Sequence, residues 1–504
     1  MNRNSRKAFM LMILAGISLL TASCSGGGAG GVEEEKFPLS NKIIPDEGLR
    51  YCVNRLSELS DWSSTADVRH VDCSDERLNP PRTFIKSISG ISVFANLESL
   101  NLTPNSKIDA LPLDPLISDL SPLHGMSAIR KLSLNRNSVS DLIVLSTLKN
   151  LEYLDLTGNN PVDFEPLKGL KKLRELRVRY SIWGGDGWPN ANESVSGLSQ
   201  LSSLTYGNAQ DEDFSPIRKL TGLKSLSLYA STGVSNIDFL GSLPALEELF
   251  LRGFREEDVS FETIGGLRDL RKLTLINTFF FSASPYEVCN IPNALSGLVK
   301  LESLALEHVN GLCVDLSITS GMVNLKSLSV SGGYIRNFSA VGGHVNLEVL
   351  AVGSQQMDGN RVAALDLQSI YQLQKLKAVW FDGVTIFEYP LLSKLPQIEY
   401  AYFDDVTAAT DYANGCELIP GCGAESLPLT DWQAVLSGAM SVEYLSFEGS
   451  SFNRLDVLYG LPNLKWLNIR SLKRFQDMKS LTCDEIRAYT SSLPVGKVEV
   501  YSSC

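Results

Sequence analysis

Residues 129–178 decide the fold of this chain: IRKLSLNRNSVSDLIVLSTLKNLEYLDLTGNNPVDFEPLKGLKKLRELRV. The motif Leu-x-x-Leu-x-Leu, with some apolar exchanges, occurs three times in this stretch and begins at Ile129, Leu151 and Leu173. The copies are 22 residues apart. The alternating end of each copy predicts a short strand with one buried face. Because one such unit cannot cover its own apolar edge, we expect successive units to stack on one continuous core.

The same motif recurs along most of the chain, which has 504 residues. The repeats predict an α/β solenoid, a right-handed superhelix of about 15–17 short parallel strands over residues 81–472. Longer steps between copies indicate insertions near residues 104–115, 183–192, 279–295 and 408–429. Weaker end copies begin at Val68 and Val495. The motif starts are Leu97, Ile129, Leu151, Leu173, Leu201, Leu223, Leu246, Leu270, Leu301, Leu325, Leu347, Leu376, Ile398, Val442 and Leu464.

Both ends of such a stack need a cover. Residues 42–80 are expected to form the N-terminal cap, with a helix over residues 46–59. Residues 473–504 are expected to form the C-terminal cap. There, Thr482-x-x-Glu485 is a capping-box pattern that begins a helix, and residues 498–500 supply a last strand.

The segment that returns from one strand to the next often reads Asp-x-x-Pro-Leu, as at residues 119–123. Together with the 22-residue step, this pattern resembles the internalin-type leucine-rich repeat of bacterial surface proteins. Residues 44–50, IPDEGLR, resemble the start of the helical N-terminal cap of these proteins. The resemblance covers residues 42–504. It implies the fold strongly and the ligand hardly at all, because one fold carries many functions.

The N-terminus predicts export. Residues 1–23 have a basic start and an apolar run at residues 9–20 that is too short to span a membrane. Residues 21–24, TASC, resemble the lipobox of bacterial lipoproteins, which implies acylation of Cys24. Residues 24–41 then form a flexible tether rich in Gly and Glu. We therefore expect an extracytoplasmic protein that its lipid anchors to the outer membrane or cell surface; the alternative is a plain secretion signal cut just before Cys24.

The other eight cysteines are an even number, which indicates disulfides in an exported protein. Their clustering in the sequence favours neighbouring pairs, the last of which would close the C-terminal cap. The competing interpretation is a metal site, but the chain has no Cys-x-x-Cys motif and its four histidines are scattered. We therefore expect no metal and no cofactor. The favoured pairs are Cys52–Cys73, Cys289–Cys313, Cys416–Cys422 and Cys483–Cys504.

The x positions of the motif point away from the core, onto the open concave face. Their third and fifth positions are small in the middle repeats, as at Ser327 and Ser329. The late repeats instead carry aromatic residues, which we expect to form one ligand-binding patch bordered by negative charge. The alternative is that these rings pack across strands and support the sheet. The predicted binding residues are Trp380, Tyr400, Tyr402, Tyr444 and Trp466, with Asp382 and Asp404 at the border.

The net charge and the motif content of the sequence reduce the number of function classes to consider. A net charge of −12 argues against nucleic acid, because phosphate contacts need clustered Lys and Arg. No hydrolase, P-loop, dinucleotide or zinc-protease motif is present, so we expect no enzyme. We expect a monomer that binds a protein or glycan ligand in adhesion or recognition and touches the membrane only through its lipid. The alternative is a structural envelope scaffold or assembly factor without a discrete ligand pocket.

Overall fold

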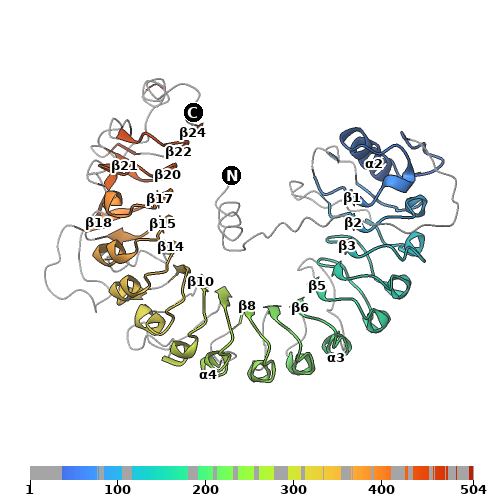
Figure 1. Ribbon diagram of the computed structural model, residues 1–504, viewed down its shortest axis with the longest axis horizontal. Helices are drawn as coiled ribbons and strands as arrows, with labels where there is room; N and C mark the ends of the chain where they lie inside the picture. Colours follow the sequence, from blue (N-terminus) through green and yellow to red (C-terminus); the bar gives the residue numbers. More distant parts are fainter. Residues whose placement is uncertain are drawn as a thin grey trace. The chain divides into compact units, whose positions relative to one another are not determined.

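The computed structural model forms two compact units, residues 1–246 and 247–504. In each unit, short parallel strands form one side and short helices form the opposite side (Figure 1). Residues 1–36, on which the predicted signal, the Cys24 lipid and most of the tether fall, lie outside the described residues. The structure describes residues 37–75, 78, 84–104, 116–179, 191–207, 213–230, 237–254, 260–276, 293–307, 313–332, 334–353, 365, 367–386, 391–409, 426–428, 435–452, 458, 460–470, 473–474, 484 and 499–502.

Unit 1 begins with the helix α2, Glu47–Leu59. Asp46 is its N-cap: the backbone N–H of Leu49 donates to Asp46 Oδ1 at 2.8 Å, which satisfies one of the free donors at the helix start. Asp46 Oδ2 accepts from the backbone N–H groups of Lys86 and Ser87 at 3.0 and 3.1 Å. One carboxylate therefore starts the helix and ties it to the chain that leads into the repeats.

A disulfide joins Cys52 of α2 to Cys73, which directly follows the first strand. The two Cα atoms are 5.8 Å apart, and both residues are buried. The helix is thereby fixed beside the end of the sheet, as the pairing of neighbouring cysteines predicts. For the other expected pairs, the cysteines or their side chains lie outside the described residues, so those pairs stay predictions.

The main sheet of unit 1 is parallel, and each strand pairs with the next along the chain. The register places Leu132 opposite Leu154 and Leu154 opposite Leu176. Leu204 lies opposite Leu226 in the same way, and all of these leucines are buried. The leucines of successive repeats therefore form one continuous row, which confirms the predicted solenoid. The strands are β1 (His70–Asp72), β2 (Ser99–Asn101), β3 (Lys131–Ser133), β4 (Tyr153–Asp155), β5 (Glu175–Arg179), β6 (Ser203–Gly207) and β7 (Ser225–Tyr229).

Most return segments of unit 1 are single 3₁₀ turns, and their sequence explains why. Asp119 and Asp163 each accept a hydrogen bond from the backbone N–H two residues on, at 2.8 and 2.9 Å. Pro122 and Pro166 then occupy the first positions, where the missing N–H costs nothing. The helices of unit 1 after α2 are η1 (Thr65–Asp67), η2 (Ile91–Val93), η3 (Ser121–Leu123), η4 (Ile143–Thr147), η5 (Glu165–Gly169), α3 (Ala191–Ser196), η6 (Ser215–Lys219) and η7 (Asp238–Ser242).

Buried asparagines close the turns that follow the early strands. Asn159 Nδ2 donates to the carbonyl oxygens of Leu134 and Leu156 at 2.7 and 3.1 Å, and its Oδ1 accepts from the N–H of Val139 at 2.9 Å. Asn137 makes the same kind of contacts one repeat earlier. These amides bridge neighbouring coils, because the backbone groups there have no partner in the sheet.

The main sheet of unit 2 is also parallel and keeps its apolar residues in register. Leu328 lies opposite Leu350 and Val352 opposite Phe381. Phe403 stacks in the core between Phe381 and Phe447, with ring centroids 5.9 and 6.1 Å apart. The strands are β8 (Glu248–Arg252), β9 (Lys272–Ile276), β10 (Ser303–Glu307), β12 (Ser327–Ser331), β14 (Val349–Gly353), β15 (Ala378–Asp382), β17 (Tyr400–Asp404), β20 (Tyr444–Ser446), β22 (Trp466–Asn468) and β24 (Glu499–Tyr501).

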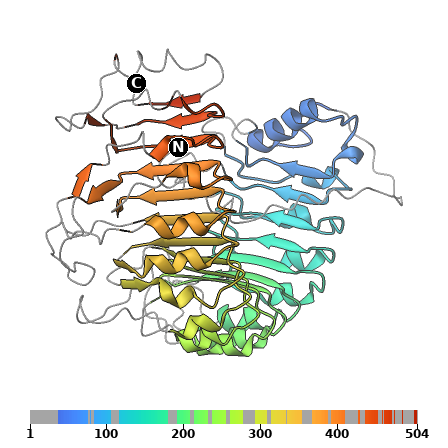
Figure 2. The ribbon, with the colours of Figure 1, turned by 60° about the vertical axis from the view of Figure 1, so that its left-hand side comes forward.

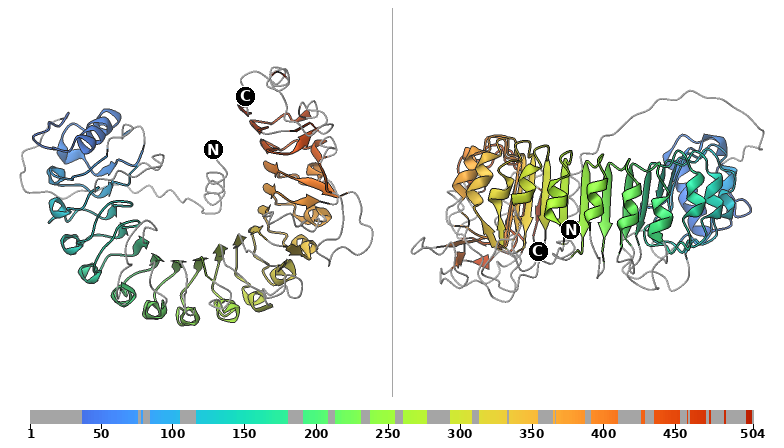
Figure 3. Two further views of the ribbon diagram at one scale, coloured as in Figure 1. Left: turned by 180° about the vertical axis from the view of Figure 1, so that it is seen from behind. Right: turned by 90° about the horizontal axis from the view of Figure 1, so that it is seen from below.

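Figure 2 shows the late strands of unit 2 side by side, and the row of short helices on its outer side is visible from below in Figure 3. The predicted last strand is β24, which pairs with β22. Within the described part of the chain, no helix is long and apolar enough to cross a membrane. The helices of unit 2 are α4 (Phe261–Gly265), η9 (Asn293–Gly297), η10 (Leu316–Thr319), η11 (Phe338–Gly343), η12 (Leu367–Gln372) and η13 (Leu392–Lys394).

Unit 2 also has small secondary sheets that hydrophobic periodicity does not predict. They follow the main strands, where the chain leaves the sheet, and most of their pairings are parallel. The segment between β17 and β20 contributes the antiparallel pair of β18 and β19. The members are β11 (Cys313–Asp315) with β13 (Tyr334–Arg336), β16 (Thr385–Ile386) with β18 (Thr407–Ala409) and β19 (Ser426–Pro428), and β21 (Ser451–Phe452) with β23 (Lys473–Arg474).

Candidate ligand-binding surface

The late strands of unit 2 carry aromatic side chains on the face that points away from the core. Alternation along each strand sends one set of residues inward and the other outward. In β15, for example, Val379 and Phe381 are buried while Trp380 is only half-buried. All five residues below are half-buried. The name aromatic patch is used for Trp380, Tyr400, Tyr402, Tyr444 and Trp466.

The rings of the aromatic patch contact one another across strands. Trp380 stacks on Tyr402, with ring centroids 4.8 Å apart and planes 21° apart. Tyr400 stacks on Tyr444 at 4.6 Å and 10°. Trp466 leans toward Tyr402 at 6.1 Å and 55°. The structure thus brings together all five aromatic residues that the sequence pattern groups.

A polar layer lies beneath the rings. The Ser446 hydroxyl donates to Asp404 Oδ1 at 2.6 Å, and the backbone N–H of Glu448 donates to the same oxygen at 2.9 Å. Asn468 Nδ2 donates to Ser446 Oγ at 2.9 Å. Ser446 lies opposite Tyr402 in the register, and its small side chain leaves room for the diagonal contact between Tyr402 and Trp466.

Asp404 is therefore part of this supporting layer. Only 6% of the residue is exposed, and its carboxylate accepts two hydrogen bonds from β20 and the residues after it. Asp382, its register partner on β15, is half-buried. The sequence placed both residues at the border of the patch, but it gave no sign that one of them holds two strands together.

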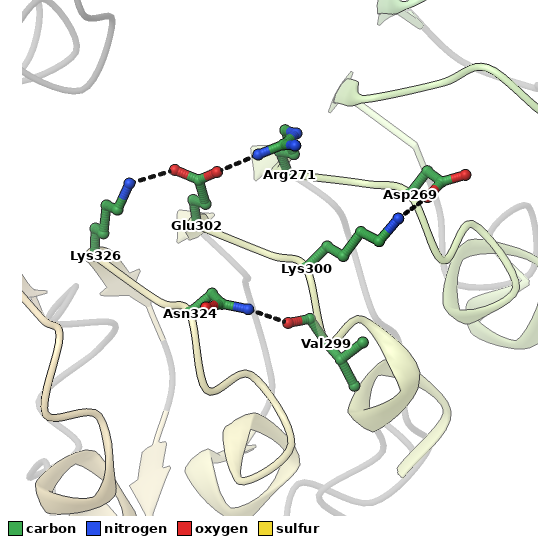
Figure 4. A network of polar contacts seen from close by, with 7 residues as sticks. All are labelled: Asp269, Arg271, Val299, Lys300, Glu302, Asn324 and Lys326. Atoms are coloured by element: carbon green, nitrogen blue, oxygen red, sulfur yellow. Dashed lines mark hydrogen bonds and ion pairs between the residues drawn. The ribbon is translucent and has the colours of Figure 1, made fainter.

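Charged residues at the second position of the motif form a ladder along the strand starts. In unit 2, Glu302 pairs with Arg271 at 2.6 Å and with Lys326 at 2.7 Å (Figure 4). Lys326 and Arg271 lower the pKa of Glu302, the hydrogen bond from Lys326 most strongly. The pairs are solvent-exposed, so each contributes only about 0–1 kcal/mol to stability. The second positions alternate in sign along Arg271, Glu302, Lys326, Glu348, Lys377 and Glu399.

The alternation fails once in unit 2, beside the aromatic patch. Glu399 is followed in the sheet by Glu443, because β17 pairs directly with β20. The motif starts of these two strands, Ile398 and Val442, are 44 residues apart, which is twice the usual 22. Burial raises the pKa of Tyr400, and the charges of Tyr444, Glu399 and Glu443 act in the same direction. Two carboxylates, Glu399 and Glu443, therefore lie side by side next to the stacked tyrosines. Elsewhere in the ladder of unit 2, a base separates two successive acids.

The strand face of unit 1 combines aromatic and basic residues instead. The Arg177 guanidinium lies over the Tyr153 ring, 5.5 Å from its centroid, and Arg179 lies over Tyr229 at 4.6 Å. Gly207, opposite Arg179 in the register, permits the second contact, because a Cβ at this position would stand 2.7 Å from Tyr229 Cβ. Such cation–π contacts are favourable where the ring is partly desolvated.

Metal binding has no support in the described residues, where no group of His, Cys, Asp and Glu is placed to hold an ion. The surface offers rings, hydroxyls and carboxylates. Such an arrangement suits recognition of another molecule.

Comparison with known proteins identifies the class. Residues 127–169 match the family described as Leucine Rich repeats (2 copies). The match falls within the stacked leucines and parallel register, which give the chain a leucine-rich-repeat solenoid fold. No curated protein matches the chain.

Solved structures with similar folds come from bacteria and plants. One is an internalin (inlF) from Listeria monocytogenes, with 17% identity, 80% of this chain and 96% of that chain covered, and a TM-score of 0.43. Another is a leucine-rich-repeat protein of Leptospira interrogans, with 18% identity, 86% and 96% covered, and a TM-score of 0.44. A third is the ectodomain of a plant membrane receptor kinase from Arabidopsis thaliana, with 18% identity, 77% and 46% covered, and a TM-score of 0.38.

Proposed function

We propose that this chain is an extracytoplasmic, lipid-anchored recognition protein that binds another protein through the aromatic patch of unit 2. The observation that carries the proposal is the clustering of five half-buried aromatic rings on the outward face of neighbouring strands. Aromatic residues are enriched at the energetic centres of protein interfaces, because rigid rings bury much area at little entropic cost.

Packing within the sheet is the competing explanation of the same rings. The inward face of these strands already has its own aromatic stack, Phe381, Phe403 and Phe447, which fills the core. The outward rings are therefore an addition to a complete core. A contiguous cluster of half-buried rings on a protein surface is unfavourable unless it is used, and this supports a binding role.

The location follows from two observations of different kinds. The N-terminal sequence predicts export and acylation of Cys24. The buried Cys52–Cys73 disulfide supports an oxidising compartment, because cytosolic proteins rarely keep such bonds. Both are consistent with a protein that is held outside the cytoplasm by its N-terminal lipid.

The test is binding of the purified full-length chain to arrays of secreted and surface proteins and of glycans. Tyr402→Ala and Trp466→Ala are each expected to weaken binding to the recovered partner by about tenfold or more, as at interface hot spots. Tyr153→Ala, an aromatic truncation on the strand face of unit 1, is the matched control and should leave the affinity unchanged. Circular dichroism melts check that each variant is folded.

Two results would contradict the proposal. If Tyr402→Ala and Trp466→Ala unfold the protein, the rings serve packing. If both variants fold and bind as the parent does, the binding face lies elsewhere. Partners found only on the glycan array would change the class of ligand.

A scaffold without a discrete ligand is the second candidate, and the small side chains of β10 and β12 favour it. Ser303, Ala305, Ser327 and Ser329 offer little contact area on the strand face. The same arrays distinguish the two functions, because a scaffold would recover no partner at any concentration.

A further inference from the structure

The two units differ in the charged residues that accompany the aromatic residues of their strand faces. In unit 1, the protein supplies its own cations, since Arg177 lies over Tyr153 and Arg179 over Tyr229. Among the described residues of unit 2, no lysine or arginine lies over the stacked rings of Tyr400 and Tyr444. Lys465 interacts electrostatically with both tyrosines, but it pairs with Glu443 and lies over neither ring, so this stack lacks the overlying cation found in unit 1.

Charges around the aromatic patch are mainly negative at both ends of its strands. At the strand starts, Lys377 pairs with Glu348 and Lys465 with Glu443, each at 2.7 Å, so these bases are already engaged. Beyond the strand ends, the described bases are Arg470 and, in β23, Lys473 and Arg474. The acidic residues are Asp382, Glu399, Asp404, Asp405, Glu443 and Glu448.

The break in the charge ladder concentrates this excess of negative charge beside the tyrosine stack. Elsewhere in unit 2 each acid of the ladder stands between bases, as Glu302 stands between Arg271 and Lys326. Glu399 and Glu443 stand next to each other, because the 39 residues between β17 and β20 add no strand to the main sheet. The position that the alternation assigns to a base is missing from the sheet, directly beside the Tyr400–Tyr444 stack.

We infer that the aromatic patch binds a partner polypeptide segment that presents arginine or lysine side chains. One cationic group would lie against the Tyr400–Tyr444 stack, near Glu399 and Glu443, as Arg177 lies over Tyr153 in unit 1. The rings and the adjacent carboxylates would both attract the partner's cationic group at this point. Complementary charge also speeds the association of the two molecules. The inference rests on the proposed function and specifies that the partner's binding segment is positively charged.

The test uses the full-length chain and three synthetic peptides: hexa-arginine, hexa-lysine and hexa-glutamate. Their dissociation constants are measured by titration calorimetry at about 50 and 150 mM salt, because screening separates general attraction from a local contact. The double variant Glu399→Gln/Glu443→Gln is expected to weaken hexa-arginine binding at least fivefold. Tyr444→Leu, which keeps an apolar side chain but removes the ring, is expected to weaken it to a similar degree.

The matched control is Glu302→Gln/Glu348→Gln, which removes the same number of charges from the same unit. It should change the affinity less than twofold. The inference is overturned if hexa-glutamate binds as well as hexa-arginine. It is also overturned if the control and test variants lose equal affinity, since attraction would then come from the net charge alone.

The outcomes separate this inference from the proposed function. An array partner that needs Tyr402 and Trp466 but is insensitive to Glu399→Gln/Glu443→Gln leaves the proposed function intact and overturns the cationic partner. If hexa-arginine binding depends on Glu399 and Glu443 but the arrays recover no partner, the cationic preference of the surface is supported and the proposed function is contradicted. A neutral glycan that binds the aromatic patch while hexa-arginine and hexa-lysine both fail to bind overturns the inference.

Discussion

His344 is a buried titratable residue in a chain with few histidines. Only 2% of it is exposed, and its Nε2 lies 2.7 Å from the Thr319 hydroxyl of the preceding repeat. Burial lowers the pKa of His344, against a smaller opposite effect of a hydrogen bond to the Met322 backbone. The neutral ring therefore bridges two repeats of unit 2.

Protonation of His344 is expected to destabilise unit 2 in acid. The unfolded chain takes up the proton at the ordinary histidine pKa of about 6.5, and the folded chain only at a lower pH. Stability should be constant with respect to this group above about pH 6.5 and fall as the pH drops toward its folded pKa. Melting temperatures between pH 8 and pH 5 measure this slope.

The control compares His344→Gln with His124→Gln, the same change at an exposed position. The slope between pH 6.5 and pH 5 should shrink in the first variant and persist in the second. Equal slopes in both would show that other groups cause the acid sensitivity.

Residue roles were predictable from sequence only where the repeat fixes them. The turn asparagines at positions 137 and 159 stand out because they recur at the repeat step, and both proved to be buried and fully engaged. Asp404 recurs at the repeat step as Asp382, its register partner, so the pattern could not distinguish a border charge from a buried acceptor. Its role depends on Ser446, which lies 42 residues away in the chain.

At the scale of elements, α2 shows how a helix is attached to the end of the sheet. The helix is amphipathic and buries Leu49, Cys52 and Val53, but a single short helix packs on only one neighbour. The disulfide closes a loop of 21 residues between α2 and the end of β1. Loop closure of this length contributes about 3 kcal/mol in the chain-entropy model.

Removing this bond is expected to loosen the cap before it affects the repeats. Cys52→Ser/Cys73→Ser should raise amide hydrogen exchange throughout α2, by a factor that corresponds to about 3 kcal/mol at most. Exchange in β4 and β5 should change little, because contacts in a solenoid are local. Unchanged protection of α2 would mean that burial alone holds the helix.

The sequence predicted the main elements well and the secondary sheets not at all. The expected helix over residues 46–59 differs from α2 only in that Asp46 is the cap. The main strands fall on the motif because apolar alternation sets their register. Pairs such as β11 with β13 form because stacking of the repeats aligns neighbouring turns. A strand of three residues is too short to show a hydrophobic pattern in the sequence.

At the scale of the whole molecule, each repeat depends mainly on its neighbours. A cavity in one repeat should therefore weaken its own surroundings first. Leu154→Ala, at a fully buried position of β4, is expected to cost about 2–5 kcal/mol. Hydrogen exchange should increase in β3, β4 and β5 and stay unchanged in β14 and β15.

Leu350→Ala at the equivalent position of β14 is the matched control and should give the opposite pattern. If either variant raises exchange uniformly along the chain, the solenoid unfolds as a single cooperative body.

The direct pairing of β17 with β20 has a consequence for how such a gene can diversify. Tyr400 and Tyr444 are adjacent in the sheet, so the spine is continuous although these two residues are 44 positions apart in the sequence. The described residues at the two ends of the intervening segment belong to the core, since Val406, Val435, Leu436 and Ala439 are buried. Natural variants of such a gene are therefore expected to keep these anchoring residues apolar, while the backbone scaffold on either side is inherited unchanged.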